Sequence, residues 1–219
     1  MNKIIIFGTG DIAQLANYYF TIDSEYEVVG FCVDEDYKFS NEFENKPLVS
    51  FEKVKEFYPP EEYQMFIALS YAQMNKLREE KYIQAKNKGY YLVNYISSKC
   101  SFLTQFEIGD NCFILEDNTI QPFVKLGSNI TLWSGNHIGH HSNVKDNVFI
   151  SSHVVISGHC TIEENSFLGV NSTIGHNVTI AADSLIGAGS IITKNTLQEG
   201  VYLPPKSIMI DRKSSTINL

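Results

Sequence analysis

The stretch from Ile150 to Leu168 reads ISSHVVISGHCTIEENSFL, and an aliphatic residue returns in it at every sixth position. The same spacing holds without a miss from Ile108 to Ile192, and small or β-branched residues follow most of these positions by four. Helices repeat near 3.6 residues and ordinary strands at 2, so a sustained period of six fits neither. This period predicts a parallel β-helix, in which successive short strands wind around one aliphatic core.

Residues 108 to 197 resemble the left-handed β-helix of hexapeptide-repeat acyltransferases, in which three hexapeptides form one triangular coil. The resemblance implies five coils of eighteen residues, so each residue lies against the residue eighteen positions later. Stacked at about 4.8 Å per coil, the prism is expected to be roughly 24 Å long. No hexad is interrupted, so no long loop is expected to leave the prism.

The first ninety-odd residues follow a different pattern, in which short aliphatic runs alternate with helical stretches. Strands are predicted at 3–7, 26–33, 64–69 and 90–96, a strand and then a helix over 46–57, and helices after residue 10 and over 74–87. The charged stretch from Lys76 to Lys88 predicts a solvated helix face. The alternation predicts a Rossmann-like α/β domain over residues 1–97, followed by the β-helix and a C-terminal tail over 98–219.

The chain has 219 residues and a formal net charge of −8, from 17 Lys and Arg against 25 Asp and Glu. No basic stripe occurs, so nucleic acid is not expected as a partner. The first apolar run is too short for a signal peptide, and no run approaches the roughly 18 apolar residues of a membrane span, so no membrane insertion is expected. The four cysteines are far apart and form no CxxC pair, which predicts reduced thiols and a cytoplasmic protein.

An α/β domain followed by a prism of this length resembles a group of sugar acyltransferases: the sialic-acid O-acetyltransferases, the bacillosamine N-acetyltransferases and their relatives that act on nucleotide-linked perosamine. The match runs from Ile4 to about Tyr202. It implies an enzyme whose first domain holds a nucleotide-linked sugar. It also implies a homotrimer that binds acetyl-CoA, the acyl donor, in grooves between neighbouring prisms. The expected reaction is N-acetylation of a nucleotide-linked amino-dideoxy sugar in surface-glycan precursor synthesis, without a metal.

Gly8, Thr9 and Gly10 lie between the first predicted strand and helix, in a G-x-G-x-x-[GA] pattern. Glycines there let backbone N–H groups approach a diphosphate at a helix N-terminus. Asp34 ends the second strand, and the resemblance implies that it contacts the nucleotide. Ser70 follows the third strand and is expected to line the pocket, although sheet packing explains it equally well. About 95 residues provide only half of a dinucleotide fold, so NAD is not expected.

Five of the six histidines fall between positions 137 and 159. The segment Ile-Gly-His-His-Ser at 138–142 resembles the part of the family hexad whose histidine is the general base, which implies this role for His140. A neutral imidazole accepts a proton at neutral pH, which suits attack on a thioester. The coil length places His140 against Gly158 and His141 against His159. Gly158 has no side chain to obstruct a thioester, and its N–H is expected to stabilise the developing oxyanion.

The resemblance also implies an acetyl-CoA site further along the prism. Gly169-Val170 and Gly187-Ala188 match family positions whose backbone amides meet the pantetheine arm. One departure concerns the base, because family members usually follow it with Asp or Glu and this chain has His141. A carboxylate would fix the tautomer of the imidazole, so either another residue orients His140 or His141 shares its work.

Three alternatives stay open at this stage. The acceptor could be a sugar hydroxyl, as in the sialic-acid type of O-acetyltransferase. His140, His141, His153 and His159 could supply zinc ligands, as in the trimeric hexapeptide-repeat carbonic anhydrases, although that family lacks the leading α/β domain. The chain could also be a non-catalytic scaffold that holds a nucleotide, since fold motifs do not fix function.

Overall fold

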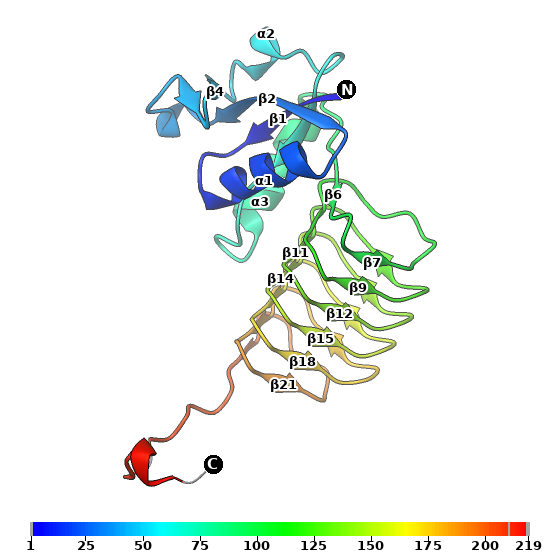
Figure 1. Cartoon of the computed structure of the whole chain (residues 1–219). Helices are drawn as coiled ribbons and strands as arrows, with labels where there is room; N and C mark the ends of the chain where they lie inside the picture. Colours follow the sequence, from blue (N-terminus) through cyan, green and yellow to red (C-terminus); the bar gives the residue numbers. More distant parts are fainter. Residues whose placement is uncertain (1, 210, 218–219) are drawn as a thin grey trace.

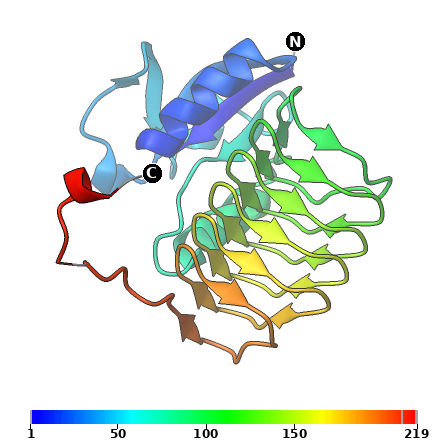
Figure 2. The same ribbon diagram turned by 60° about the horizontal axis from the view of Figure 1, so that its bottom comes forward.

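The hexad repeat forms a left-handed parallel β-helix whose coils stack into a triangular prism (Figures 1 and 2). The computed structural model describes residues 2–209 and 211–217. Each wall of the prism is a parallel sheet, and strand partners lie eighteen residues apart, as His137 and Val155 do, except in the last pair, where Leu185 and Val201 lie sixteen residues apart. The predicted β-helix and its coil length are therefore confirmed.

The three walls are named here by their numbers of strands. The seven-stranded wall contains β6 (Tyr95–Ile96), β8 (Phe113–Ile114), β11 (Thr131–Leu132), β14 (Phe149–Ile150), β17 (Phe167–Leu168), β20 (Leu185–Ile186) and β22 (Val201–Tyr202). The six-stranded wall contains β7 (Ser101–Phe102), β9 (Thr119–Ile120), β12 (His137–Ile138), β15 (Val155–Ile156), β18 (Thr173–Ile174) and β21 (Ile191–Ile192). The four-stranded wall contains β10 (Lys125–Leu126), β13 (Asn143–Val144), β16 (Thr161–Ile162) and β19 (Thr179–Ile180).

The hexad aliphatic residues form the core of the prism. From Ile114 to Ile192 all of them are buried, whereas Ile108 at the first position is only half-buried. Small inward side chains such as Ser142 and Cys160 lie buried between them, where the walls converge. The period of six therefore arises because each strand points one aliphatic side chain into the core. Removing these aliphatic side chains from water is the main contribution to the stability of the prism.

The chain turns at three corners, and the corner joining the four-stranded to the seven-stranded wall is called the domain corner here. Its positive-φ positions are all asparagine or aspartate: Asn111, Asn129, Asn147, Asn165 and Asp183, with φ between 54° and 63°. These residue types tolerate the left-handed region better than bulkier ones. The other two corners are mixed at the equivalent positions, where Asn and Asp alternate with histidine, glycine and one phenylalanine.

The α/β domain contains a five-stranded sheet in the order β3-β4-β2-β1-β5, with only the β3–β4 pair antiparallel. Its elements are β1 (Asn2–Phe7), α1 (Asp11–Ile22), β2 (Tyr26–Val33), a 3-10 turn (Glu35–Tyr37), β3 (Glu42–Phe43), β4 (Lys46–Ser50), α2 (Val54–Phe57), β5 (Gln64–Ile67) and α3 (Lys76–Asn87). The predicted parallel α/β sheet is therefore confirmed.

The strand expected over residues 90–96 divides between the two folds. Leu92 forms an isolated bridge to Met65 at the edge of the α/β sheet, but Tyr95–Ile96 (β6) pairs with β8 and forms the first rung of the seven-stranded wall. The backbone N–H of Tyr95 donates to the carbonyl of Cys112, 2.9 Å away. The β-helix thus begins before its first hexad, because the chain that leaves the α/β sheet pairs directly with β8 of the prism.

Helix α3 attaches the α/β domain to the prism. Arg78 is buried, and its guanidinium donates to the carbonyls of Asn129 and Asn147 at 3.2 and 2.7 Å. Asn75, also buried, donates through its side-chain amide to the carbonyl of Asn165 at 2.9 Å. Three successive coils are therefore held by one helix along the domain corner.

The prediction of a solvated face over 76–88 is wrong for part of this helix. Arg78, Lys81 and Ala85 are buried, while Lys76, Glu80 and Lys86 are exposed. Desolvation lowers the pKa of Arg78 to about 9, which reflects how completely the prism encloses it. A charge pattern along a helix cannot reveal which charged residue another domain will cover.

The described residues contain no helix that is long and apolar enough to span a bilayer. All four cysteines carry free thiols. After β22 the chain runs away from the prism as an extended segment with a 3-10 turn at Ser214–Thr216 (Figure 1).

Replacing Arg78 with Ala is expected to lower the free energy of unfolding by about 2 to 4 kcal/mol, because the substitution leaves a cavity and unpaired carbonyls between the domains. Urea denaturation followed by circular dichroism measures the change. Glu80→Ala on the exposed side of the same helix serves as the control, with an expected change below about 0.5 kcal/mol. Equal stability of the two variants would contradict the role given to Arg78.

Candidate functional site

The predicted substrate residues meet at one edge of the α/β sheet. β1, β2 and β5 are parallel neighbours, so the residues that follow them lie at the same edge: Gly8 after β1, Asp34 after β2 and Ala68 after β5. Gly10 then caps the N-terminus of α1. Open parallel sheets bind ligands in the crevice at this edge, and a helix N-terminus favours an anion.

Glycine occurs at positions 8 and 10 of the first turn for different structural reasons. Gly8 has a φ of +124°, and a Cβ there would lie 2.8 Å from the carbonyl oxygen of Ala68, so only glycine fits. Gly10 has an ordinary φ of −97°, and no heavy atom lies within 4 Å of where its Cβ would be. The space beside Gly10 at the start of α1 is therefore open to a ligand, whereas Gly8 is explained by the turn itself.

Asp34 forms an ion pair with Lys81 of α3, with Nζ 2.8 Å from Oδ1. The lysine is buried, and its Nζ also lies 5.8 and 5.9 Å from the ring centroids of Phe7 and Phe51. The pair fixes the direction of the Asp34 carboxylate and places a buried cation next to the predicted nucleotide edge. Sequence reasoning missed Lys81, because nothing in the charge pattern distinguishes it from the exposed lysines of α3.

Ser70 is half-buried just beyond β5, and its carbonyl accepts a hydrogen bond from Arg78 at 3.3 Å. Its backbone is thus part of the attachment between the domains. Thr9, between the two glycines, is also half-buried. The structure brings Gly8, Thr9, Gly10, Asp34 and Ser70 to the same edge of the sheet, and their binding of a nucleotide-linked sugar stays a prediction.

The corner between the six-stranded and four-stranded walls, residues 121–124, 139–142, 157–160 and 175–178, is called the histidine corner here. Phe123, His141 and His159 occupy three of its left-handed positions, with φ of 67°, 61° and 60°, and Asn177 occupies the fourth. Their rings form a column, in which His141 and His159 are stacked with centroids 4.8 Å apart and planes at 9°. The expected stacking of residue i on residue i+18 is confirmed for this pair.

His140 lies beside this column and over Gly158. Its Nδ1 is 3.1 Å from Nδ1 of His141, so one of the two nitrogens must carry the hydrogen. A Cβ on Gly158 would lie 2.8 Å from Nε2 of His140, which places this nitrogen directly over the glycine. The backbone N–H of His140 donates to Oε1 of Gln121, 2.9 Å away, a contact that the sequence did not suggest.

Glycine also borders the Gly158 amide. A Cβ on Gly139 would lie 2.6 Å from the nitrogen of Gly158, so the absence of a side chain at 139 keeps the space beside that N–H free. The same relation recurs between Gly169 and the nitrogen of Ala188, again at 2.6 Å.

The predicted acetyl-CoA residues lie at the third corner, called the glycine corner here, which joins the seven-stranded to the six-stranded wall. Val170 and Ala188 are exposed there, while Gly169 and Gly187 are buried. The N–H groups of both glycines already donate, to the carbonyls of Ile186 and Tyr202, each at 2.7 Å. The expectation that these two amides bind pantetheine is therefore wrong, because the coil stacking uses them.

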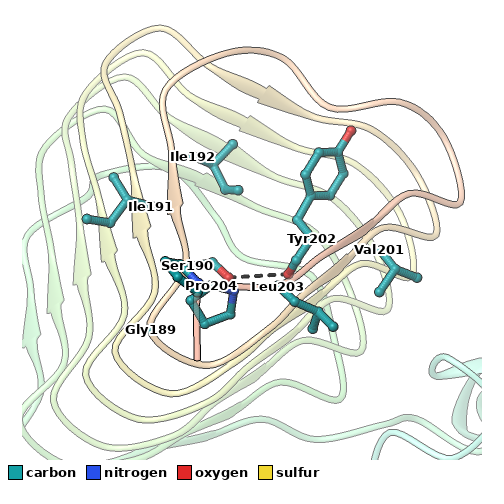
Figure 3. Close-up of a pocket in the computed structure, with 9 residues that line it drawn as sticks. Gly189, Ser190, Ile191, Ile192, Val201, Tyr202, Leu203 and Pro204 are labelled. Carbon is teal, nitrogen blue, oxygen red and sulfur yellow. Dashed lines mark hydrogen bonds between the residues drawn. The ribbon is translucent and has the colours of Figure 1, made fainter. Parts of the chain in front are cut away.

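A hollow of about 470 Å³ opens beyond Ala188, at the last coil of the prism (Figure 3). It is lined by residues 189–192 and 201–205, and the Ser190 hydroxyl donates to the carbonyl of Tyr202 at 3.2 Å across it. Ile191 and Leu203 expose much of their side chains at this end. The glycine corner thus leads into an open, partly apolar end of the prism.

Within one chain these groups are separated. The α/β domain packs on the domain corner and on the seven-stranded wall, where Tyr71 contacts the rings of Phe149 and Phe167. In a triangular prism the histidine corner lies opposite that wall (Figure 2). The glycine corner is separated from the histidine corner by the width of the six-stranded wall. The sheet edge, His140 and Val170 therefore do not form one site in a single copy.

The sequence pattern of the family described as bacterial transferase hexapeptide (six repeats) matches residues 159–194. No curated protein sequence matches the chain. Among solved structures, the acetyltransferase domain of PglB from Neisseria gonorrhoeae aligns with a TM-score of 0.80 at 17% identity, over 92% of this chain and 96% of that one. The chain therefore has the same fold as this acetyltransferase domain.

Two further structures extend this likeness. A variant of perosamine N-acetyltransferase from Caulobacter crescentus, solved with CoA and GDP-perosamine, aligns with a TM-score of 0.79 at 18% identity, over 92% of this chain and 93% of that one. WeeI from Acinetobacter baumannii aligns with a TM-score of 0.74 at 17% identity, over 92% and 94%. The arrangement of an α/β domain on a left-handed β-helix is thus common to all three and to this chain.

Gly8→Ala is expected to lower the free energy of unfolding by about 1 to 3 kcal/mol, because alanine resists the positive φ and meets the Ala68 carbonyl. Gly10→Ala, in open space two residues away, is the matched control and is expected to cost less than about 1 kcal/mol. Thermal or urea unfolding of both variants measures the difference. Similar losses at the two positions would show that the turn geometry has been misjudged.

Proposed function

We propose that this chain is an acetyltransferase that moves an acetyl group from acetyl-CoA to the amino group of a nucleotide-linked amino-dideoxy sugar, in the synthesis of a surface-glycan precursor. The observation that carries the proposal is the His140 ring, held over Gly158 with its Nδ1 against Nδ1 of His141. An imidazole beside a side-chain-free backbone amide is the arrangement that base-assisted attack on a thioester requires.

The solved relatives support the chemistry. Two of the three are acetyltransferases by name, and one of these was solved with CoA and GDP-perosamine. This chain covers more than nine-tenths of each of those chains, and it has both the sheet edge for a nucleotide and the prism. Since the identities are 17 and 18%, the residues that carry the reaction are argued from this chain alone.

His140 acts as the general base and His141 positions it. When His140 donates its Nδ1–H to Nδ1 of His141, the lone pair of His140 is left on Nε2, over Gly158. His141 thereby fixes the tautomer, as a carboxylate would, but it accepts the hydrogen bond without a negative charge. Having His141 in place of the usual Asp or Glu changes how His140 is oriented, but His140 is still the general base.

The reaction proceeds by direct attack. The sugar amine adds to the thioester carbonyl while Nε2 of His140 takes its proton, and the Gly158 N–H stabilises the oxyanion of the tetrahedral intermediate. The C–S bond then breaks, the proton passes to the sulfur, and coenzyme A leaves as the thiol. The products are the N-acetylated sugar nucleotide and coenzyme A, with no covalent enzyme intermediate.

Acetyl-CoA is expected to bind along the glycine corner. Val170 and Ala188 are exposed there, and Gly169 leaves the Ala188 nitrogen free of a covering side chain. The hollow beyond them, lined by Ile191 and Leu203, offers apolar surface at the end of the groove. The Ala188 N–H replaces the amides of Gly169 and Gly187 as the backbone donor toward the pantetheine arm.

The separation of these groups supports a homotrimer. The sheet edge, the histidine corner and the glycine corner of one copy face different directions, so a complete site needs groups from neighbouring copies. A ring of three prisms with threefold symmetry brings a histidine corner of one copy against a glycine corner of the next, three times over. The active sites are then shared between subunits.

His140→Ala is expected to lower kcat/KM for coenzyme A release about 10²- to 10⁴-fold, the usual contribution of a general base. The assay uses UDP-, dTDP- and GDP-linked amino sugars, with product mass confirming N-acetylation. Glu61→Ala is the control, since Glu61 is exposed and precedes β5, at the edge of the sheet opposite the predicted substrate residues. A fully active His140→Ala enzyme would exclude the proposed base.

The same panel separates the other functions. Turnover only with a free hydroxylated sugar would favour O-acetylation, and nucleotide binding without any turnover would favour a scaffold.

Sharing of the site is tested by mixing two inactive variants. Gly10→Asp places a negative charge in the open space at the start of α1 and is expected to repel a diphosphate while preserving the fold. Randomly mixed trimers of Gly10→Asp and His140→Ala are expected to regain activity at about a quarter of their sites, where two intact halves meet. Activity no higher than that of the separate variants would place the whole site within one chain.

A further inference from the structure

The histidine corner carries ring side chains at positions where the backbone disfavours them. At the equivalent positions of the domain corner every residue is Asn or Asp, whereas Phe123, His141 and His159 stand in succession here with φ near 60°. Asparagine or aspartate satisfies the same turn at the domain corner, so the backbone permits histidine here but does not require it.

Three of the four histidines of this corner converge. Each of His140, His141 and His159 offers one ring nitrogen, and these nitrogens all lie within 4.8 Å of one another. The Nδ1 atoms of His140 and His141 are 3.1 Å apart, and two nitrogens bound to one tetrahedral metal ion stand about 3.3 Å apart. His159 is exposed, and its ring must rotate away from the stack with His141 to complete a three-nitrogen set.

We propose that His140, His141 and His159 bind a divalent transition-metal ion, with Zn²⁺ as the best fit, through Nδ1 of His140 and His141 and one ring nitrogen of His159. Three imidazoles with an open fourth position are an established zinc geometry. Ligands that are all imidazole suit Zn²⁺, Ni²⁺ or Cu²⁺ and not Mg²⁺ or Ca²⁺, which prefer oxygen.

The His176 ring lies 5.3 Å from that of His159 and stays outside the converging set.

Metal binding has a direct consequence for the base, and this part rests on the proposed function. A neutral imidazole has one lone pair and one N–H, so coordination through Nδ1 of His140 forces the hydrogen onto Nε2. The lone pair over Gly158 is then lost, and the base cannot accept a proton. Zn²⁺ is thus an inhibitor at this site and supplies no chemistry to the acetyl transfer.

Calorimetric titration of the chelator-treated, tag-free protein with ZnCl₂ tests the site without any substrate. Wild type is expected to bind about one ion per chain, and His159→Asn is expected to weaken binding by more than about tenfold, since even outer partners of metal ligands are worth that much. His153→Asn is the matched control, with the same turn geometry and exposure but outside the cluster, and is expected to bind as wild type does. Equal affinity of wild type and His159→Asn, or an equal loss in His153→Asn, would overturn the proposal.

Inhibition is measured separately, by the mass of the acetylated product, because released coenzyme A is a thiol that itself binds zinc. His159→Asn is expected to keep wild-type activity without metal and to resist Zn²⁺ concentrations that inhibit wild type more than tenfold. Inhibition of both to the same degree would refute the link to the base. If no amino sugar is acetylated at all, the proposed function fails while the calorimetry still decides the metal site.

Discussion

The whole prism depends on the burial of one aliphatic side chain per six residues. This column fixes the coil at eighteen residues, and the coil length decides every neighbour along the walls and corners. Because an aliphatic residue in the wrong register would leave the core, the stacking is specified as strongly as the core is buried. The approach of His140 to Gly158 and the ring stack of His141 on His159 are consequences of that register, at a corner far from the core itself.

The union of the two folds depends on a different interaction, the buried polar contacts of α3. Arg78 and Asn75 donate to carbonyls at the domain corner, while Lys81 on the same helix holds Asp34 at the nucleotide edge. One helix therefore sets both the orientation of the α/β domain and the direction of a predicted ligand-binding carboxylate. Such buried donors are costly without partners, so their pairing selects this one arrangement of the domains.

Glycine has three distinct uses in this chain. At Gly8 it permits a backbone angle and a close carbonyl, at Gly139 and Gly169 it leaves a neighbouring amide uncovered, and at Gly158 it makes room for a ring. Only the second and third uses bear on the proposed chemistry. The same corners that need tight turns thus also provide the open amides and imidazoles, and the histidine corner can hold either a proton or a metal at the same nitrogen.

Much of the fold follows from the sequence, because the side chains buried in each coil recur at a fixed spacing that can be seen in the repeat. The period of six predicted the β-helix, and the coil of eighteen residues that the family resemblance implied predicted the strand partners and the pairing of His140 with Gly158. Strand ends predicted the meeting of Gly8, Asp34 and Ser70. The tertiary structure alone decided that Arg78 and Lys81 are buried, that β6 belongs to the prism, and that the amides of Gly169 and Gly187 are already used. It also decided that the histidine and glycine corners face apart in one copy. These features depend on which surfaces the two folds press together, and residues far apart in the chain leave no periodic signal of such contacts.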